Sequence, residues 1–232
     1  MSTSKPAAPD TTAFEGLLGH RFARADLLRE ALTHRSALQT RARRGGSNER
    51  LEFVGDRVLG LVVAEWLAER FPDESEGKLG PRLAVLVSRP VLAEVAEAIG
   101  LAAVLDVAPG EAKAGVKKRA TVLADAVEAA IGALYFDGGL DAARGFVRRA
   151  WETAMAAQVT PPRNAKSTLQ EWALGRGLKL PHYDVTARSG PPHAPVFVIA
   201  VSVAGQTGTG QAGSKQAAEQ LAAAELLGKL VK

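Results

Sequence analysis

Four acidic residues on two predicted helices carry the clearest chemical signal in this sequence. Glu52 and Asp56 are four positions apart, and Asp125 and Glu128 are three apart. At these spacings each pair lies on one face of its helix. An unpaired carboxylate among apolar side chains is costly, yet residues 120–136 contain no Lys or Arg. If the two helices pack together, the four carboxylates form a cage for a hard divalent cation.

The kind of cation follows from the kind of ligand. Carboxylates that converge raise one another's pKa unless a cation neutralises them. The sequence has no Cys, and no His stands near either pair. Oxygen ligands alone favour Mg²⁺, or Mn²⁺ in its place, over Zn²⁺. The alternative is that the acids are solvated or form salt bridges with Arg50 and Arg57. This alternative has less support for Asp125 and Glu128, because apolar residues surround them in the sequence.

The elements that position these acids belong to a helical region. From residue 14 to residue 158, apolar residues recur at intervals of three and four, and Gly and Pro interrupt them. This pattern predicts an all-α domain. Its predicted helices span residues 26–38, 48–71, 78–87, 91–99, 118–136 and 140–157. Asn48 is placed to cap the helix that carries Glu52 and Asp56. Residues 1–13, rich in Ser, Thr, Pro and Ala, are expected to form a disordered tail.

A second region begins after a short proline-containing linker at residues 159–163. Residues 164–232 predict an α+β domain with the order α-β-β-β-α. The helices are expected at 165–177 and 214–230, and the strands at 182–188, 195–203 and 206–211. This domain holds seven Lys and Arg against four Asp and Glu, and therefore most of the net charge of +4. A modest positive charge permits a polyanionic partner.

Composition excludes several other classes of protein. With 47% hydrophobic residues the chain can build real cores, but no apolar run is long enough for a membrane span. The N-terminus has no secretory signal, and the absence of Cys suits a reducing compartment. We therefore expect a cytoplasmic protein with no membrane partner and no organic cofactor.

Three motifs in the helical region carry a family resemblance. The run Asn48-Glu49-Arg50-Leu51-Glu52-Phe53-Val54-Gly55-Asp56-Arg57-Val58-Leu59 resembles the signature of the bacterial ribonuclease III family. Residues 123–133 resemble the second acidic helix of that family, and Leu32-Thr33-His34-Arg35-Ser36 resembles its upstream motif. The resemblance implies that Glu52, Asp56, Asp125 and Glu128 hold Mg²⁺, with Asp56 and Glu128 as the catalytic residues. The bound ion would supply hydroxide for attack on a phosphodiester, leaving 5′-phosphate and 3′-hydroxyl ends.

The resemblance also implies auxiliary roles. Glu49 shares the helix face of Glu52, and Glu76 matches a position at the edge of the active site. Either one is otherwise an ordinary exposed acid. Phe53 matches an aromatic residue that enters a socket of the second subunit in a homodimer, and Gly55 would allow close helix approach there. The alternative is that Phe53 is a core residue. A two-fold dimer places two cleavage centres on opposite strands, which explains short 3′ overhangs.

A basic run, Lys117-Lys118-Arg119, precedes the second acidic helix. Cations at a helix N-terminus oppose the helix dipole. Contact with a phosphate backbone would explain them, and an ordinary solvated loop is the alternative.

The C-terminal domain resembles a double-stranded RNA-binding domain. The matching stretches are residues 167–171, the loop Gly190-Pro191-Pro192-His193, and residues 214–223. The resemblance implies that Gln170, Glu171 and His193 contact 2′-hydroxyls in minor grooves and that Lys215 meets phosphates. The family usually has adjacent lysines here, whereas this chain has Gln216 and Ala217 after Lys215. Fewer cations should weaken binding and its dependence on salt.

Together these features predict a homodimeric, Mg²⁺-dependent endoribonuclease of double-stranded RNA. Family substrates are precursors of ribosomal RNA and some structured messenger, transfer and small RNAs. One alternative is a catalytically silent RNA-binding scaffold or RNA maturation factor, which would be expected to have lost some of the four acids. A DNA-binding protein is a third possibility, but the sequence has no convincing recognition-helix turn.

Overall fold

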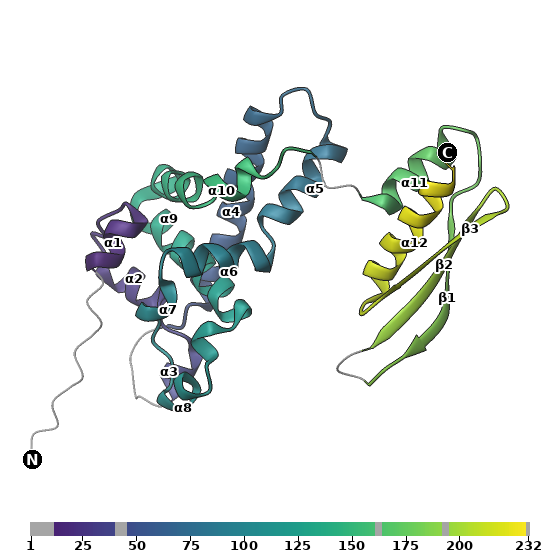
Figure 1. Cartoon of the computed structure of the whole chain (residues 1–232). Coiled ribbons are helices and arrows are strands. Elements are labelled where there is room, and N and C mark those ends of the chain that lie inside the picture. Colours follow the sequence, from purple (N-terminus) through teal and green to yellow (C-terminus); the bar gives the residue numbers. More distant parts are fainter. Residues whose placement is uncertain (1–11, 40–45, 161–163, 192–194, 231–232) are drawn as a thin grey trace, which may run out of the picture. The chain divides into compact units, whose positions relative to one another are not determined.

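A computed structural model describes residues 12–39, 46–160, 164–191 and 195–230 of the chain. The chain divides into two compact units, Met1–Pro162 and Arg163–Lys232. Figure 1 shows that the first unit is built from helices and that the second contains a sheet with two helices. The predicted fold class, an all-α domain followed by an α-β-β-β-α domain, is confirmed. Most of the predicted tail and His193 lie outside the described residues.

The first unit consists of helices joined by short connections. They are α1 (Thr12–Leu18), α2 (Ala25–Ala31), α3 (Arg35–Gln39), α4 (Glu49–Arg70), α5 (Glu76–Leu86), α6 (Arg89–Ala98), α7 (Leu101–Val104), α8 (Pro109–Lys113), the 3₁₀ turn η1 (Val116–Lys118), α9 (Ala120–Ala150) and α10 (Glu152–Ala156). Asn48 stands at the N-cap of α4, but its side chain makes no capping hydrogen bond. Asn48 therefore has the predicted position at the start of the helix, but the predicted side-chain hydrogen bond to the helix backbone is absent.

The predicted helix 26–38 is divided into α2 and α3. The reason is a pairing with a distant segment. The backbone N–H of His34 donates to the carbonyl oxygen of Asp106 at 2.9 Å, and that of Asp106 donates to Leu32 at 2.8 Å. Thr33 and Asp106 thus form an isolated parallel bridge. Because these groups bond across the unit, they are not available to continue a helix.

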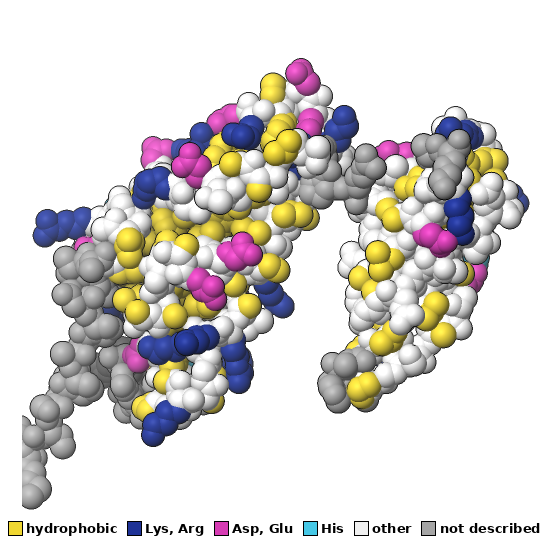
Figure 2. All heavy atoms as spheres, in the orientation of Figure 1, with side chains coloured by type: hydrophobic (Ala, Val, Ile, Leu, Met, Phe, Trp, Pro, Cys, Tyr) yellow, Lys and Arg dark blue, Asp and Glu magenta, His cyan; other side chains and the backbone are white. Residues whose placement is uncertain are grey.

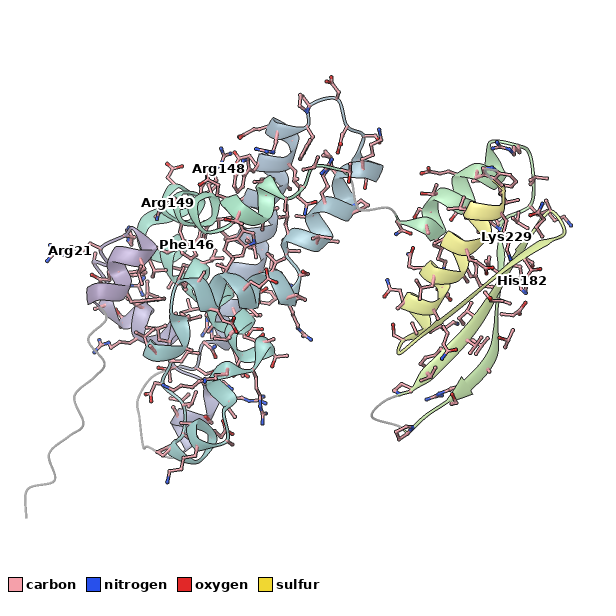
Figure 3. The ribbon with its side chains drawn as sticks, in the orientation of Figure 1. Arg21, Phe146, Arg148, Arg149, His182 and Lys229 are labelled. Atoms are coloured by element: carbon pink, nitrogen blue, oxygen red, sulfur yellow. The ribbon has the colours of Figure 1, made fainter. Side chains whose placement is uncertain are left out.

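The predicted helices 118–136 and 140–157 meet at a kink inside α9. Gly139 has φ 71° there, a backbone conformation that favours glycine. Beyond the kink, α9 is tied to α4 by two ion pairs, Arg144 with Glu65 at 2.9 Å and Arg148 with Glu69 at 2.7 Å. In Figure 3, Phe146 lies in the interior of this unit, where it is 1% exposed.

The core of the first unit lies around α4 and α9. Helix α9 is apolar on most of its surface before the kink, which suits a helix surrounded by others. It packs against α2, α4, α6 and α7. The buried residues of α4 include Leu51, Val58, Leu59, Val62, Val63 and Leu67. The two acidic helices predicted from the sequence are therefore the central helix pair of this unit.

The second unit has α11 (Ala165–Leu174), β1 (His182–Ser189), β2 (Val196–Val203), β3 (Gln206–Ala212) and α12 (Lys215–Leu230). Its strands form an antiparallel sheet in the order β1-β2-β3, with an irregularity between Val185 and Ala187. Figure 1 shows both helices on one face of this sheet. A Cβ on Gly210 of β3 would lie 2.3 Å from the carbonyl oxygen of Ala218 on α12. Glycine on β3 and alanine on α12 thus allow close packing of this helix on the sheet.

None of the helices in the described ranges is both long enough and apolar enough to cross a membrane.

Candidate active site

The site is built where α4 and α9 cross. A Cβ on Gly55 would lie 1.7 Å from the carbonyl oxygen of Glu128, and one on Gly132 would lie 2.2 Å from that of Leu51. Real side chains cannot occupy such positions, so only glycine allows these two backbones to approach so closely. Gly55 therefore allows close packing of α4 on α9 within the chain, and the approach to a second subunit at this position stays a prediction. The crossing sets the acidic turns of both helices side by side.

Three of the four acids converge at this crossing. Glu52, Asp125 and Glu128 each offer a carboxylate oxygen, and these oxygens all lie within 4.8 Å of one another. Burial, reinforced by Asp56, Glu52 and Asp125, raises the pKa of Glu128 to about 7. Burial also raises the pKa of Glu52 and of Asp125. Such a cluster of partly buried carboxylates is favoured when a cation joins it.

Asp56 lines the same pocket, and its carboxylate is paired with Arg57. Its Oδ2 lies 2.7 Å from Nη1 of Arg57, and its side chain is 49% exposed. Arg57 is held in turn by the carbonyl oxygen of Phe53, at 3.1 Å, and its guanidinium stacks on the Phe53 ring at 4.1 Å. Three of the four predicted residues thus have carboxylate oxygens within 4.8 Å of one another, and the place of Asp56 among the metal ligands stays a prediction. Asp56 remains close enough that its charge raises the pKa of Glu128.

Cations surround the acids in a pocket of about 870 Å³. Arg35, Arg57, Arg89 and Arg119 line it together with the four acids. Burial raises the pKa of Glu52, Asp125 and Glu128, and the charge of Arg89, the first residue of α6, offsets part of this rise at each of them. A pocket lined by both carboxylates and arginines suits a phosphodiester, because a metal ion and the guanidinium groups would both neutralise phosphate charge.

Basic side chains also gather near this pocket. Figure 2 shows Lys and Arg around the end of the helical unit that contains α3 and α8. Lys113 of α8 and Lys117 and Lys118 of η1 belong to this region.

Of the residues predicted to have auxiliary roles, some line the pocket and one does not. Glu49 lines the pocket, where its charge contributes to raising the pKa of Glu52. Glu76, the first residue of α5, is exposed and is not among the residues that line the pocket. Phe53 also lines the pocket and is 63% exposed, so it is not a core residue of this unit.

Several residues that line the pocket could not be predicted from the sequence. Arg89 and Glu111 come from α6 and α8, and nothing in the local sequence connects them with the acids. His34 belongs to the motif Leu32-Thr33-His34-Arg35-Ser36, but the motif alone does not predict that it lines the pocket. Their proximity depends on contacts between segments far apart in the chain.

In the second unit, the three predicted RNA contacts that the structure describes lie on its surface. Gln170 and Glu171 are exposed on α11, and Lys215 begins α12 with 61% of its side chain exposed. Glu219 lies 4.0 Å from Lys215 and pairs more closely, at 2.7 Å, with Lys166. Lys215 is therefore available to an external anion.

Comparisons with known proteins agree with both units. The family model described as ribonuclease-III-like matches residues 24–153, and that of the double-stranded RNA binding motif matches residues 165–230. A ribonuclease 3 of Methylocella silvestris is 49% identical over 199 residues, covering 86% of this chain and 83% of that protein. A ribonuclease 3 of Azorhizobium caulinodans is 47% identical, covering 84% and 83%.

A solved structure resembles the helical unit. The nuclease domain of ribonuclease III from Campylobacter jejuni superposes with a TM-score of 0.58 at 35% identity, covering 62% of this chain and 97% of that domain. The helical fold, the acid cluster and these similarities lead to one conclusion. The chain belongs to the ribonuclease III family and is an endoribonuclease of double-stranded RNA, with a helical nuclease domain followed by a double-stranded RNA-binding domain.

Proposed function

We propose that Glu52, Asp56, Asp125 and Glu128 hold Mg²⁺, which Mn²⁺ can replace, and that this site cuts double-stranded RNA to leave 5′-phosphate and 3′-hydroxyl ends. The observation that carries this proposal is the convergence of three partly buried carboxylates within 4.8 Å. The donor set fits a hard cation, because it consists of oxygen atoms. Asp56 and Glu128 are assigned as the catalytic pair.

The residues divide the work between the metal and the substrate. When bound, the ion supplies Lewis-acid chemistry at the phosphodiester. Glu52, Asp125 and Glu128 would hold it, and Asp56 would join them from its place beside Glu128. Arg89 and Arg119 line the pocket and would neutralise phosphate charge. Glu49, which lies at the rim, would orient substrate or water. Glu76 is exposed outside the pocket, so a role for it needs a partner subunit or bound RNA.

The proposed active form is a homodimer. Phe53 supports it, because an aromatic side chain that is 63% exposed on a helix beside the pocket is typical of an interface. The nuclease domain of Campylobacter jejuni ribonuclease III has a structurally flexible region that is involved in dimer formation. In a two-fold dimer, two pockets would cut opposite strands and leave short 3′ overhangs.

The second domain is proposed to bind the duplex through Gln170, Glu171, His193 and Lys215. The exposure of Gln170, Glu171 and Lys215 supports this assignment. His193 lies outside the described residues and stays a prediction. We further propose that the enzyme acts in the cytoplasm on ribosomal RNA precursors and other structured RNAs, the substrates that the family resemblance implies.

The decisive experiment uses the full chain and a labelled, perfect RNA duplex of a few tens of base pairs. Mg²⁺ and Mn²⁺ should support cleavage to short duplexes, and mapping of the ends should give 5′-phosphates and 3′ overhangs. Glu128→Gln should bind the duplex in Ca²⁺ but fail to cut it in Mg²⁺. Wild-type binding without cleavage in either Mg²⁺ or Mn²⁺ would favour the silent scaffold and overturn the proposed chemistry.

A further inference from the structure

His34 stands in the wall of the acid pocket but outside the acid cluster. Its side chain is 17% exposed. Its backbone is fixed by the bond to Asp106, and the neighbouring Thr33 accepts a hydrogen bond from the N–H of Asn48 at 3.0 Å. Asn48 directly precedes α4, the helix that carries Glu52. The ring therefore has a fixed place relative to the first acidic helix.

Ser36 determines which ring nitrogen carries the proton. The backbone N–H of Ser36 lies 3.3 Å from Nδ1 of His34, and the Ser36 hydroxyl lies 2.9 Å from the same atom. A backbone N–H can only donate, so Nδ1 must be an acceptor. The hydroxyl accepts from the N–H of Ala108 at 3.1 Å, which leaves its own hydrogen for Nδ1. Two donors on Nδ1 put the ring proton on Nε2.

One carboxylate also faces this edge of the ring. Oε2 of Glu111 lies 3.6 Å from Nδ1, beyond hydrogen-bond distance. Its charge alone would favour a proton on Nδ1, but the N–H of Ser36 already occupies that position. Glu111 therefore does not change the assignment.

His34 lines the pocket, and the hydrogen on its Nε2 is left unused. Nε2 has no hydrogen-bond partner among the described residues, and it is not among the buried polar atoms that lack one. It is therefore open to solvent. The ring lies close enough to Asp125 for a charge on it to act on that carboxyl group, whose pKa is raised chiefly by burial. A donor beside the proposed metal ligands, in a pocket lined by arginines, is placed to meet an oxygen of the substrate backbone.

We propose that His34 contacts substrate, donating a hydrogen bond from Nε2 to a phosphate oxygen of the RNA strand that is cut. Ser36 is the positioning residue that keeps the proton on Nε2. This inference rests on the proposed function, because it places the strand at the acid cluster. A neutral donor suits the position, since it binds an anionic oxygen without repelling a cation held by Glu52, Asp125 and Glu128.

Two substitutions of His34 separate substrate contact from a structural role. In His34→Asn the amide matches the position of Nδ1, so it keeps a partner for Ser36 but cannot reach the site of Nε2. In His34→Gln the amide nitrogen reaches as far as Nε2 and keeps the donor. If His34 contacts RNA, His34→Gln recovers activity and His34→Asn does not. A structural role predicts the opposite order.

The measurements use the full chain and the labelled duplex. Single-turnover cleavage is followed in Mg²⁺, and duplex affinity is measured in Ca²⁺ in a Glu128→Gln background, so that binding is tested even if cleavage fails. His34→Asn should lose at least about tenfold in cleavage rate or in affinity, as expected for a lost hydrogen bond to a charged group, with an unchanged melting temperature. Ser36→Ala should lose less, and Ser36→Thr should restore the loss.

The outcomes distinguish this inference from the proposed function. Absence of cleavage by the wild type in Mg²⁺ and Mn²⁺ would overturn the proposed function. Equal cleavage and equal affinity for His34→Asn and wild type would overturn the role of His34 alone. Equal losses in His34→Asn and His34→Gln would also overturn it.

Discussion

Gly55 of α4 lies against the main-chain carbonyl group of Glu128 on α9, and a Cβ on Gly55 would come within 1.7 Å of that carbonyl oxygen. This contact links the fold to the chemistry. Gly55 stands between Glu52 and Asp56 in the sequence, and Glu128 is itself one of the clustered acids. The distance between the two acidic helices is therefore set at the residues that make up the site.

The first prediction concerns this contact. In Gly55→Ala the added methyl group must push α4 and α9 apart, which should cost about 1–3 kcal/mol of folding free energy and abolish cleavage. Gly60→Ala on the same helix is the matched control, because a Cβ there meets nothing within 4 Å. It should be neutral or stabilising by up to about 1 kcal/mol. Urea unfolding and duplex cleavage would measure both variants, and equal behaviour would refute the argument.

The second prediction concerns Glu128 and stability without metal. Its pKa is about 7 in the folded chain against an ordinary value of 4.5. The folded state therefore holds the proton more tightly than the unfolded state, and the contribution of Glu128 to stability falls as pH rises through this window. Glu128→Gln should raise the melting temperature in EDTA at about pH 8 and change it little near pH 5. A gain that is larger at the lower pH would contradict the sign.

The third prediction concerns metal affinity. A ligand whose pKa is about 7 must lose its proton when the cation binds. Mg²⁺ affinity should therefore weaken below about pH 7, by at most about tenfold per pH unit. Calorimetric titration in two buffers of different ionisation enthalpy would detect the released proton. Release of no proton at about pH 6.5 would show that Glu128 is not a ligand.

The fourth prediction concerns the dimer. Phe53→Ala should turn the protein into a monomer at micromolar concentration and leave the fold intact, because the ring is 63% exposed. Leu17→Ala on α1 is the control, since Leu17 is similarly exposed, at 55%. Sedimentation velocity would compare them, with circular dichroism as the test of folding. A Phe53→Ala variant with the oligomeric state of the wild type would remove Phe53 from the interface.

The fifth prediction concerns the RNA-binding domain. Lys215→Ala should lower the slope of log affinity against log salt by about one, because one phosphate contact is lost. The control is Lys229→Ala on the same helix, whose ammonium group is already engaged by Glu225 at 2.7 Å and by the Thr207 carbonyl oxygen at 2.9 Å. Lys229 lies in the last turn of α12 (Figure 3). Equal slopes for the two variants would argue against Lys215 as a contact.

Local patterns in the sequence determined much of the fold. The recurrence of apolar residues predicted α4 and both halves of α9, and the change of pattern after residue 158 predicted the second domain. The spacing of Glu52 and Asp56 already put both on one helix face. These properties depend on the 3.6-residue period of a helix and on turn residues, which act over short stretches of chain.

Tertiary structure alone decided which residues meet. Arg89 and Glu111 reach the pocket because α6 and α8 pack beside α4 and α9, and His34 reaches it because its strand-like segment pairs with Asp106. Asp56 pairs with Arg57, which its spacing from Glu52 did not predict, although its charge still acts on Glu128. The physical reason is the same in each case. Periodicity fixes which face a side chain occupies, whereas its partners depend on contacts between segments that are distant in sequence.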